Sequence, residues 1–246
     1  MNSKRTFTKP LAGTLLSTSA PQIAEIIADS GFDWVMIDME HSALTLESVQ
    51  NAIQVMGDRI MTIVRVPGND EIWIKRVLDT GCDGILVPMV NSAAEAMDAV
   101  RYSKYPPDGK RSVGLSRAHM YGPGFTSYVE NANNDLILII QVEHVDAVRN
   151  LDGILEIKGI DSVFIGPYDL SASMGLTGQL TNPEVKSAIR LIKDKCRKAG
   201  MPYGIFGMSA ETISAEMNEG GTFLLCGVDT AILSAAYRDM LKVLKK

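Results

Sequence analysis

Two acidic residues, Glu143 and Asp169, follow apolar segments of the kind that form buried strands. Glu143 comes directly after the most apolar segment of the chain, Leu136 to Val142, and Asp169 follows Ser162 to Ile165 and a Gly166-Pro167 turn. One helix-plus-strand unit separates them, so the two carboxylates can meet at one edge of a parallel sheet, where they would repel each other without a cation. The pair predicts a divalent metal site. The alternative is that Asp169 caps a helix in a surface turn.

The predicted metal ligands are all oxygen atoms, which favours Mg²⁺ or Mn²⁺ over Zn²⁺ and also accommodates Co²⁺. Two protein ligands leave about four octahedral positions for water and for a chelating substrate. A 2-oxo acid is a substrate of this kind, because its carboxylate and its keto oxygen can bind the cation together.

Three further polar residues, Asp38, His41 and Arg65, lie at or just beyond the ends of the predicted strands Trp34 to Asp38 and Ile60 to Val66. Arg65 stays charged and presents a planar fork suited to a carboxylate or enolate oxygen. His41 can exchange a proton near neutral pH, and Asp38 could orient its imidazole, so the two are a candidate base with its positioning group. The alternatives are an ion pair of Arg65 with Asp38 or Glu40, and a purely structural histidine.

Other polar residues are weaker candidates. His144 follows a predicted ligand and should point away from it, and His119 lies in a long predicted loop. Lys110 and Arg111 in that loop could attract an anionic substrate or could simply face solvent. No lysine lies at the C-terminal end of a predicted strand, which disfavours an aldolase that works through a Schiff base.

A recurring unit of helix, glycine and strand indicates how these residues could be brought together. Gly31, Gly81 and Gly159 each follow a predicted helix and precede a short apolar segment, and Gly220-Gly221 is a looser fourth copy. Eight strands are predicted, at residues 11–16, 34–38, 60–66, 84–88, 136–142, 162–165, 203–206 and 222–226. Eight such units in order predict an α/β fold, a single-domain (β/α)8 TIM barrel over residues 1–246 with its site at the C-terminal ends of the strands.

Two segments depart from this repeated pattern of helix, glycine and strand. Residues 104–134 carry many Gly and Pro residues and are predicted to form a long loop, which in a compact domain is usually functional or mobile. The predicted last helix, Asp229 to Lys246, carries an apolar stripe. This helix either packs on its own barrel or is exchanged with or contacts a second subunit.

Composition excludes several classes of function. The formal net charge is -5, with 24 basic and 29 acidic residues, so the chain has no basic excess for nucleic acid. The three cysteines are odd in number and widely spaced, which is typical of a reducing compartment. No segment approaches the roughly 20 apolar residues of a membrane span, and no apolar leader begins the chain. A cytoplasmic protein without membrane partners is predicted.

Five motifs together carry a resemblance that runs nearly end to end. They are Ile37-Asp38-Met39-Glu40-His41, Val64-Arg65-Val66-Pro67, Tyr105-Pro106-Pro107-Asp108-Gly109-Lys110-Arg111, Gln141-Val142-Glu143-His144 and Ile165-Gly166-Pro167-Tyr168-Asp169-Leu170-Ser171. The sequence resembles the HpcH/HpaI family of metal-dependent, class II pyruvate aldolases, which includes 4-hydroxy-2-oxoheptanedioate and 2-dehydro-3-deoxyglucarate aldolases.

The resemblance implies a hexamer of three dimers that exchange their C-terminal helices. It implies the following site: Glu143 and Asp169 as metal ligands, Arg65 as the enolate-stabilising residue, His41 with Asp38 as the base, Gln141 as a substrate contact, and backbone groups around Gly166 and Tyr168 for the pyruvate carboxylate. Tyr168 is a departure, because better-known members carry a small residue there. The segment Leu15-Leu16-Ser17 also lacks the aromatic residue that some members have.

The implied reaction is reversible cleavage of a 4-hydroxy-2-oxo acid, of the 2-keto-3-deoxy sugar acid or 4-hydroxy-2-oxo diacid type, to pyruvate and an aldehyde. The enolate would be stabilised by the metal and Arg65. Two alternatives stay open: a citrate-lyase-like enzyme that cleaves a carbon–carbon bond in an acyl-CoA thioester, and a non-catalytic barrel that binds a 2-oxo acid.

Overall fold

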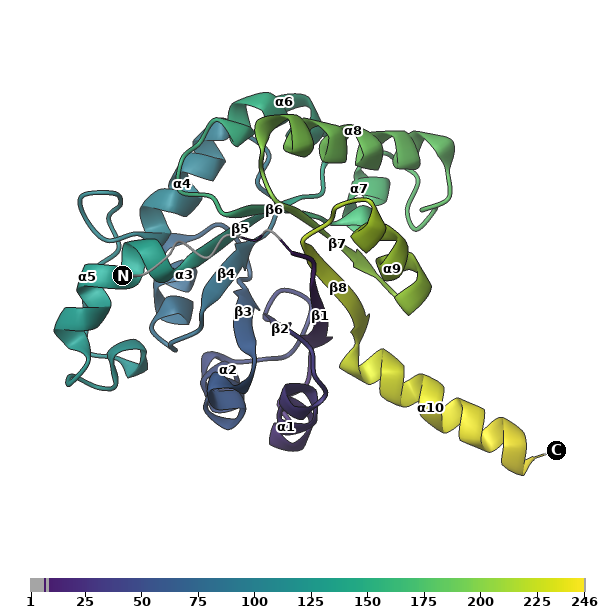
Figure 1. Ribbon diagram of the computed structural model, residues 1–246, viewed down its shortest axis with the longest axis horizontal. Helices are drawn as coiled ribbons and strands as arrows, with labels where there is room; N and C mark the ends of the chain where they lie inside the picture. The colour runs from purple at the N-terminus through teal and green to yellow at the C-terminus, as the bar shows by residue number, and fades with distance from the viewer. Residues whose placement is uncertain (1–6, 8, 246) are drawn as a thin grey trace.

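Eight parallel strands close into a barrel in the computed structural model, which describes residue 7 and residues 9–245 (Figure 1). Each strand pairs with the next along the chain, and β8 pairs with β1. The strands are β1 (Leu11–Leu16), β2 (Trp34–Asp38), β3 (Met61–Arg65), β4 (Gly84–Val87), β5 (Ile137–Val142), β6 (Ser162–Ile165), β7 (Tyr203–Gly207) and β8 (Phe223–Val228). The predicted TIM barrel is confirmed, and the C-terminal ends of all eight strands open at one mouth.

Helices follow each strand and surround most of the barrel (Figure 1). They are α1 (Pro21–Asp29), α2 (Leu46–Met56) with the 3-10 helix η1 (Gly57–Arg59), α3 (Glu71–Leu78), α4 (Ala93–Ser103), η2 (Arg117–His119), α5 (Phe125–Asp135), α6 (Val145–Leu155), α7 (Pro167–Ser173), α8 (Pro183–Ala199), α9 (Ala210–Asn218) and α10 (Asp229–Leu244). The glycines of the recurring unit adopt the left-handed backbone that lets each helix stop and turn into the next strand, for example Gly31 at φ 85° and Gly159 at φ 97°. Within residues 9–245, no helix is long and apolar enough to cross a membrane.

Large apolar side chains fill the inside of the barrel and leave its polar residues at the mouth. Trp34 is fully buried and packs edge-on against Phe223 and Phe164, with ring centroids 5.4 and 6.4 Å away. Gly13 lies opposite Trp34 in the β1–β2 register, and a Cβ atom there would come within 2.4 Å of the indole ring. Trp34 and Phe223 begin their strands and so fill the N-terminal part of the interior, whereas Phe164 lies nearer the mouth, which leaves the C-terminal mouth as the open end of the barrel.

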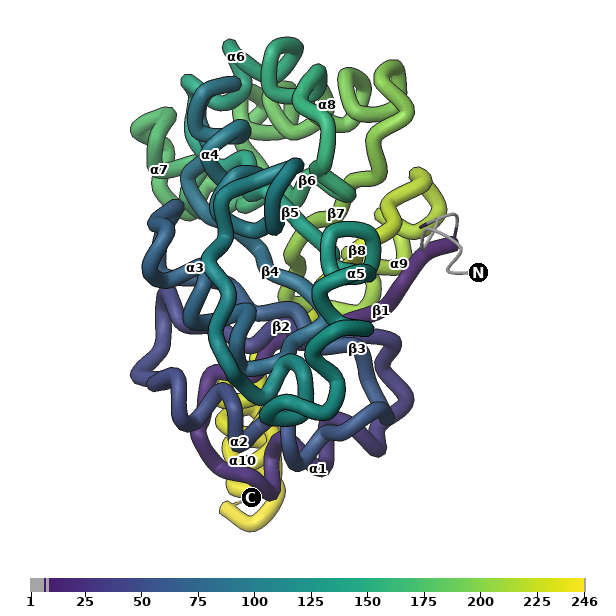
Figure 2. The backbone as a smooth tube through the Cα atoms, turned by 90° about the vertical axis from the view of Figure 1, so that its left-hand side faces the viewer, coloured from purple at the N-terminus to yellow at the C-terminus, as the bar shows by residue number. Residues whose placement is uncertain are grey.

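The predicted long loop is only partly a loop. Residues 104–134 contain η2 and most of α5, and in Figure 2 this segment lies along the side of the barrel that faces the viewer. Arg111 anchors it, because its guanidinium pairs with Asp79 at 2.9 Å and packs against the rings of Tyr105 and Tyr128. The glycines and prolines mark the turns around these short helices and conceal them from a periodicity analysis.

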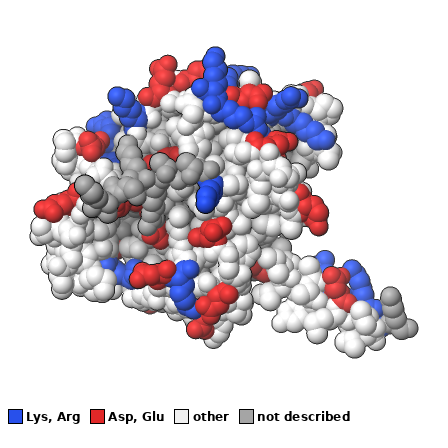
Figure 3. Space-filling model, viewed as in Figure 1, with Lys and Arg blue, Asp and Glu red and all other residues white. Residues whose placement is uncertain are grey.

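The last helix does not pack on its own barrel. α10 leaves β8 and projects beyond the body of the molecule (Figure 1), and most of its visible surface is uncharged (Figure 3). Its exposed apolar side chains are Ile232, Leu233, Tyr237, Met240, Leu241, Val243 and Leu244. The expectation of packing on its own barrel is therefore wrong, and the apolar stripe of α10 is left for another partner.

Candidate active site

Asp38 and Arg65 form a buried, two-pronged ion pair at the mouth of the barrel. The last residues of β2 and β3 are opposite each other in the register, which brings Arg65 Nε 2.8 Å from Asp38 Oδ1 and Arg65 Nη2 2.7 Å from Asp38 Oδ2. Burial raises the pKa of Asp38, but the hydrogen bond and charge of Arg65 outweigh burial and hold the pKa below its ordinary value. Arg65 therefore does form the ion pair with Asp38 that was given as the alternative. This ion pair fixes the direction in which the guanidinium points.

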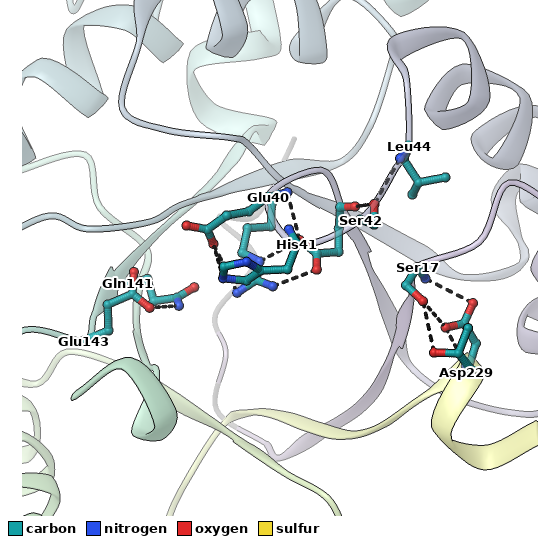
Figure 4. A network of polar contacts seen from close by, with 11 residues as sticks. Ser17, Glu40, His41, Ser42, Leu44, Gln141, Glu143 and Asp229 are labelled. Atoms are coloured by element: carbon teal, nitrogen blue, oxygen red, sulfur yellow. Dashed lines mark hydrogen bonds and ion pairs between the residues drawn. The ribbon is translucent and has the colours of Figure 1, made fainter. Parts of the chain in front are cut away.

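Glu40 is a second acid on Arg65 and the nearest acid to the imidazole of His41 (Figure 4). Arg65 Nη1 lies 3.2 Å from Glu40 Oε2, yet this oxygen accepts no hydrogen bond from the described residues, so the contact is an ion pair of poor hydrogen-bond geometry. His41 Nε2 lies 3.7 Å from the same oxygen. Burial, with repulsion from Asp38 and Asp169, raises the pKa of Glu40 to about 7 against the opposing charge of Arg65.

His41 lies at the rim, with 60% of its side chain exposed. Asp38 accepts a hydrogen bond from the backbone N–H of His41 at 3.3 Å, whereas its carboxylate faces Arg65. The structure therefore places Glu40, and not Asp38, beside the imidazole, because Asp38 is still inside the strand while His41 lies beyond the following bend. Sequence reasoning had treated Glu40 only as a partner for Arg65; its position two residues beyond the inward-facing Asp38 was the available signal.

Glu143 is buried just beyond β5 and has both carboxylate oxygens engaged. Oε1 accepts a hydrogen bond from the backbone N–H of Met89 at 2.8 Å, and Oε2 accepts one from the side-chain amide of Gln141. Met89 adopts a left-handed backbone at φ 54°, a conformation that costs a non-glycine residue about 1 kcal/mol or more. Sequence reasoning missed Met89, whose role depends on its backbone alone.

Gly166 brings the ends of β5 and β6 together. A Cβ atom at this position would lie 2.7 Å from Glu143 Oε2 and 2.9 Å from the Gln141 amide nitrogen, so only glycine fits without displacing them. Asp169 follows in the first turn of α7. A cavity of about 310 Å³ opens here, and its wall includes the predicted residues Asp38, His41, Arg65, Gln141, Gly166, Tyr168 and Asp169.

The acids of the mouth suit a cation. Burial, opposed by the Met89 N–H, raises the pKa of Glu143 to about 7, with repulsion from Glu40 and Asp169 adding to the rise. The amide oxygen of Gln141 is buried without a hydrogen-bond partner in the described part of the chain. No cluster of three or more His, Cys, Asp or Glu residues that could hold a metal occurs among the described residues, and the assignment of Glu143 and Asp169 as metal ligands stays a prediction.

The weaker candidates lie away from the cavity wall. His144 caps α6, where its Nδ1 accepts the backbone N–H of Asp146 at 3.2 Å, and His119 is buried against α5. Neither Lys110 nor Arg111 lines the cavity. Lys110 is paired with an acid at the surface, Glu71, at 2.7 Å, and Arg111 is buried and holds the side segment in place.

Comparison with known proteins fits this geometry. The model of the HpcH/HpaI aldolase/citrate lyase family matches residues 12–236. The chain belongs to this family. It is 38% identical over 231 residues to a 4-hydroxy-2-oxo-heptane-1,7-dioate aldolase of Shigella sonnei, a match that covers 93% of this chain and 88% of the relative. The family's aldolases cleave carbon–carbon bonds, so the chain is a carbon–carbon lyase of the aldolase type.

Solved structures extend the comparison. An HpcH/HpaI aldolase/citrate lyase family protein from Burkholderia cenocepacia J2315 superposes with a TM-score of 0.93 at 30% identity, covering 97% of this chain and 96% of that one. A citrate lyase beta subunit from M. tuberculosis, solved with oxaloacetate and magnesium, has the same fold, with a TM-score of 0.60 at 13% identity over 91% of this chain and 94% of that one. The family is one of metal-dependent aldolases.

Proposed function

We propose that this aldolase reversibly cleaves a 4-hydroxy-2-oxo acid to pyruvate, or a closely related 2-oxo acid, and an aldehyde. The C3–C4 bond breaks, the C4 hydroxyl loses its proton as C4 becomes the aldehyde carbon, and C3 gains a proton. The observation that carries the proposal is the excess of acid at the mouth: burial raises the pKa of Glu40 and of Glu143, repulsion from Asp169 adds to both rises, and the guanidinium of Arg65 lies against Asp38 and Glu40. Such a site fits a cation and an anionic substrate.

Glu143 and Asp169 are the residues proposed to hold Mg²⁺ or Mn²⁺, with Co²⁺ also accommodated. When bound, the cation would supply Lewis-acid chemistry at the carboxylate and keto oxygen of the substrate. The buried amide oxygen of Gln141 lies beside this place and could accept a hydrogen bond from substrate or bound water. Backbone groups around Gly166 and Tyr168 are proposed to hold the pyruvate carboxylate.

Arg65 is proposed to stabilise the developing negative charge, and His41 is proposed to transfer the proton. Asp38 and Glu40 fix the guanidinium of Arg65 at the cavity wall, so its positive charge is already in place where the enolate oxygen develops. His41 would move the proton, and its exposed position lets it exchange that proton with water. Glu40, with a pKa near neutrality, could share this proton.

Exchange of the methyl protons of pyruvate in D₂O, followed by NMR, tests the proposal without knowledge of the aldehyde. Exchange should require Mg²⁺ or Mn²⁺, stop with EDTA, and fall in Glu143→Ala and His41→Ala. His144→Ala is the matched control, because His144 caps α6 outside the cavity wall. Absence of exchange with every metal would contradict a pyruvate aldolase and direct attention to acyl-CoA substrates.

The apolar stripe of α10 supports a homo-oligomer. The resemblance implies a hexamer of three dimers with exchanged C-terminal helices, and a helix that leaves its own barrel with this stripe exposed suits such an exchange. Light scattering after chromatography tests this. Leu241→Glu should lower the molar mass, whereas Lys242→Glu, next to it and paired with Asp239, should not. A monomer in the unaltered protein would contradict the exchange.

A further inference from the structure

The cavity at the mouth has two chemically different halves. One half carries the polar residues assigned above to the 2-oxo acid. The other half is formed by Leu15, Phe164, Tyr168, Phe206 and Val228, with the hydroxyl residues Ser17 and Thr230 at its edge. Apart from the backbone around Tyr168, the proposed chemistry uses only the first half, so the side chains of the second half are left for the rest of the substrate.

Two aromatic rings form the wall of the second half. Tyr168 comes from the first turn of α7 and Phe206 from the end of β7, and their ring centroids are 6.1 Å apart at an interplanar angle of 51°. Tyr168 directly precedes Asp169, so this wall begins beside the proposed metal ligand. Leu15 and Val228 come from the ends of β1 and β8, which are paired in the barrel.

A buried acid lies behind the edge of this half, and neither Lys nor Arg lies at the edge among the described residues that line the cavity. Asp229 is buried and accepts hydrogen bonds from the N–H and hydroxyl of Ser17, at 3.0 and 2.6 Å (Figure 4), and from the N–H and hydroxyl of Thr18, at 3.1 and 3.0 Å. Among the described residues that line the cavity, Arg65 is the one Lys or Arg, and it already faces Asp38 and Glu40. A second carboxylate on the substrate would thus lose water here without gaining a positive partner.

We propose that the wall of Tyr168 and Phe206 binds the aldehyde part of the substrate and selects an uncharged, apolar aldehyde. This proposal rests on the proposed function and names its substrate class. It sets the chain apart from relatives named for a heptane-1,7-dioate, since cleavage of that diacid between C3 and C4 releases 4-oxobutanoate, an aldehyde with a carboxylate at its far end.

The test compares two acceptors of nearly equal shape in condensation with pyruvate. 4-Oxobutanoate carries the carboxylate, and 4-methylpentanal has an isopropyl group in its place, with two methyl groups where the carboxylate has its two oxygens. The unaltered protein should use 4-methylpentanal with a kcat/KM at least about tenfold higher, in line with the selectivity of hydrophobic pockets. Tyr168→Ala should reduce this preference severalfold, and Tyr168→Phe should keep it because the ring remains. Tyr121→Ala, an exposed tyrosine outside the cavity wall, is the matched control.

The outcomes separate this proposal from the proposed function. Equal use of both acceptors, or preference for 4-oxobutanoate, overturns the apolar selection, as does a preference that survives in Tyr168→Ala and Phe206→Ala alike. Failure of both aldehydes while pyruvate still exchanges its methyl protons overturns the acceptor proposal and leaves the pyruvate chemistry standing. Absence of pyruvate exchange overturns both.

Discussion

Glu143→Gln should stabilise the metal-free protein at pH 8 while it removes activity. The pKa of Glu143 rises from 4.5 to about 7, chiefly through burial, which corresponds to about 3 kcal/mol of folding stability lost when the group is charged. Glutamine removes that charge and keeps an oxygen for the Met89 N–H. The free amide oxygen of Gln141 can turn to accept the new amide. A gain of about 1 to 3 kcal/mol is expected.

The same shift predicts a pH dependence with a definite sign. Between about pH 4.5 and 7 the native Glu143 keeps a proton that the unfolded chain has released, so stability falls as the pH rises through this window and levels off above it. Glu40, with its pKa also raised to about 7, acts in the same direction. In Glu143→Gln only the contribution of Glu40 should remain.

Urea unfolding in EDTA at pH 5 and pH 8, followed by the fluorescence of the buried Trp34, measures these differences. Glu71→Gln is the matched control, because Glu71 is a half-exposed surface acid and should change stability by less than about 0.5 kcal/mol. A Glu143→Gln variant that is less stable than the unaltered protein at pH 8 would refute the reasoning that the acids of the mouth strain the metal-free fold.

Three further substitutions have expected outcomes. Gly166→Ala should reduce pyruvate proton exchange at least about tenfold with the circular dichroism unchanged, because its methyl group would displace Glu143. Arg65→Ala should lower the free energy of unfolding by about 3 to 5 kcal/mol, since it leaves Asp38 buried without its cation. Asp229→Ala should lower the free energy of unfolding by about 2 kcal/mol, since the N–H and hydroxyl groups that donate hydrogen bonds to Asp229 lose their acceptor.

Each of these variants has a matched control in the chain. Gly153→Ala adds a Cβ atom whose nearest contact is 3.7 Å away, so exchange should not change. Arg149→Ala and Asp239→Ala remove partners of exposed ion pairs on α6 and α10 and should each cost less than about 0.5 kcal/mol in urea unfolding. Equal effects in a variant and its control would show that the site geometry is not responsible.

The barrel could be predicted from sequence because its repeated unit has strong local signals. Glycines with a left-handed backbone, such as Gly31 and Gly159, end the helices, and the apolar segments after them have no other place than a sheet buried on both faces. The start of α6 was not predicted, because its N-cap residue His144 had been considered only as a weak site candidate. α7 was missed, because it is a short helix that begins inside the Gly166-Pro167 turn.

The site could be predicted in its residue types but not in its contacts. The predicted ends of the strands were enough to select four site residues, Asp38, Arg65, Gln141 and Glu143. The barrel brings these residues to one mouth. The choice of Arg65 over His41 as partner of Asp38 depends on a register of one residue across β2 and β3, which no local pattern encodes. The backbone contact of Met89 with Glu143 carries no side-chain signal at all.

Binding of Mn²⁺ to the purified protein, followed by electron paramagnetic resonance, tests the central claim most directly. We predict one site per chain, at least about tenfold weaker affinity in Glu143→Gln and in Asp169→Asn, and a spectrum that changes when pyruvate is added. Asp146→Asn, on the exposed start of α6, should leave the affinity unchanged. Mn²⁺ bound equally well by the Glu143 and Asp169 variants, or a spectrum indifferent to pyruvate, would contradict a metal-dependent 2-oxo-acid site at this mouth.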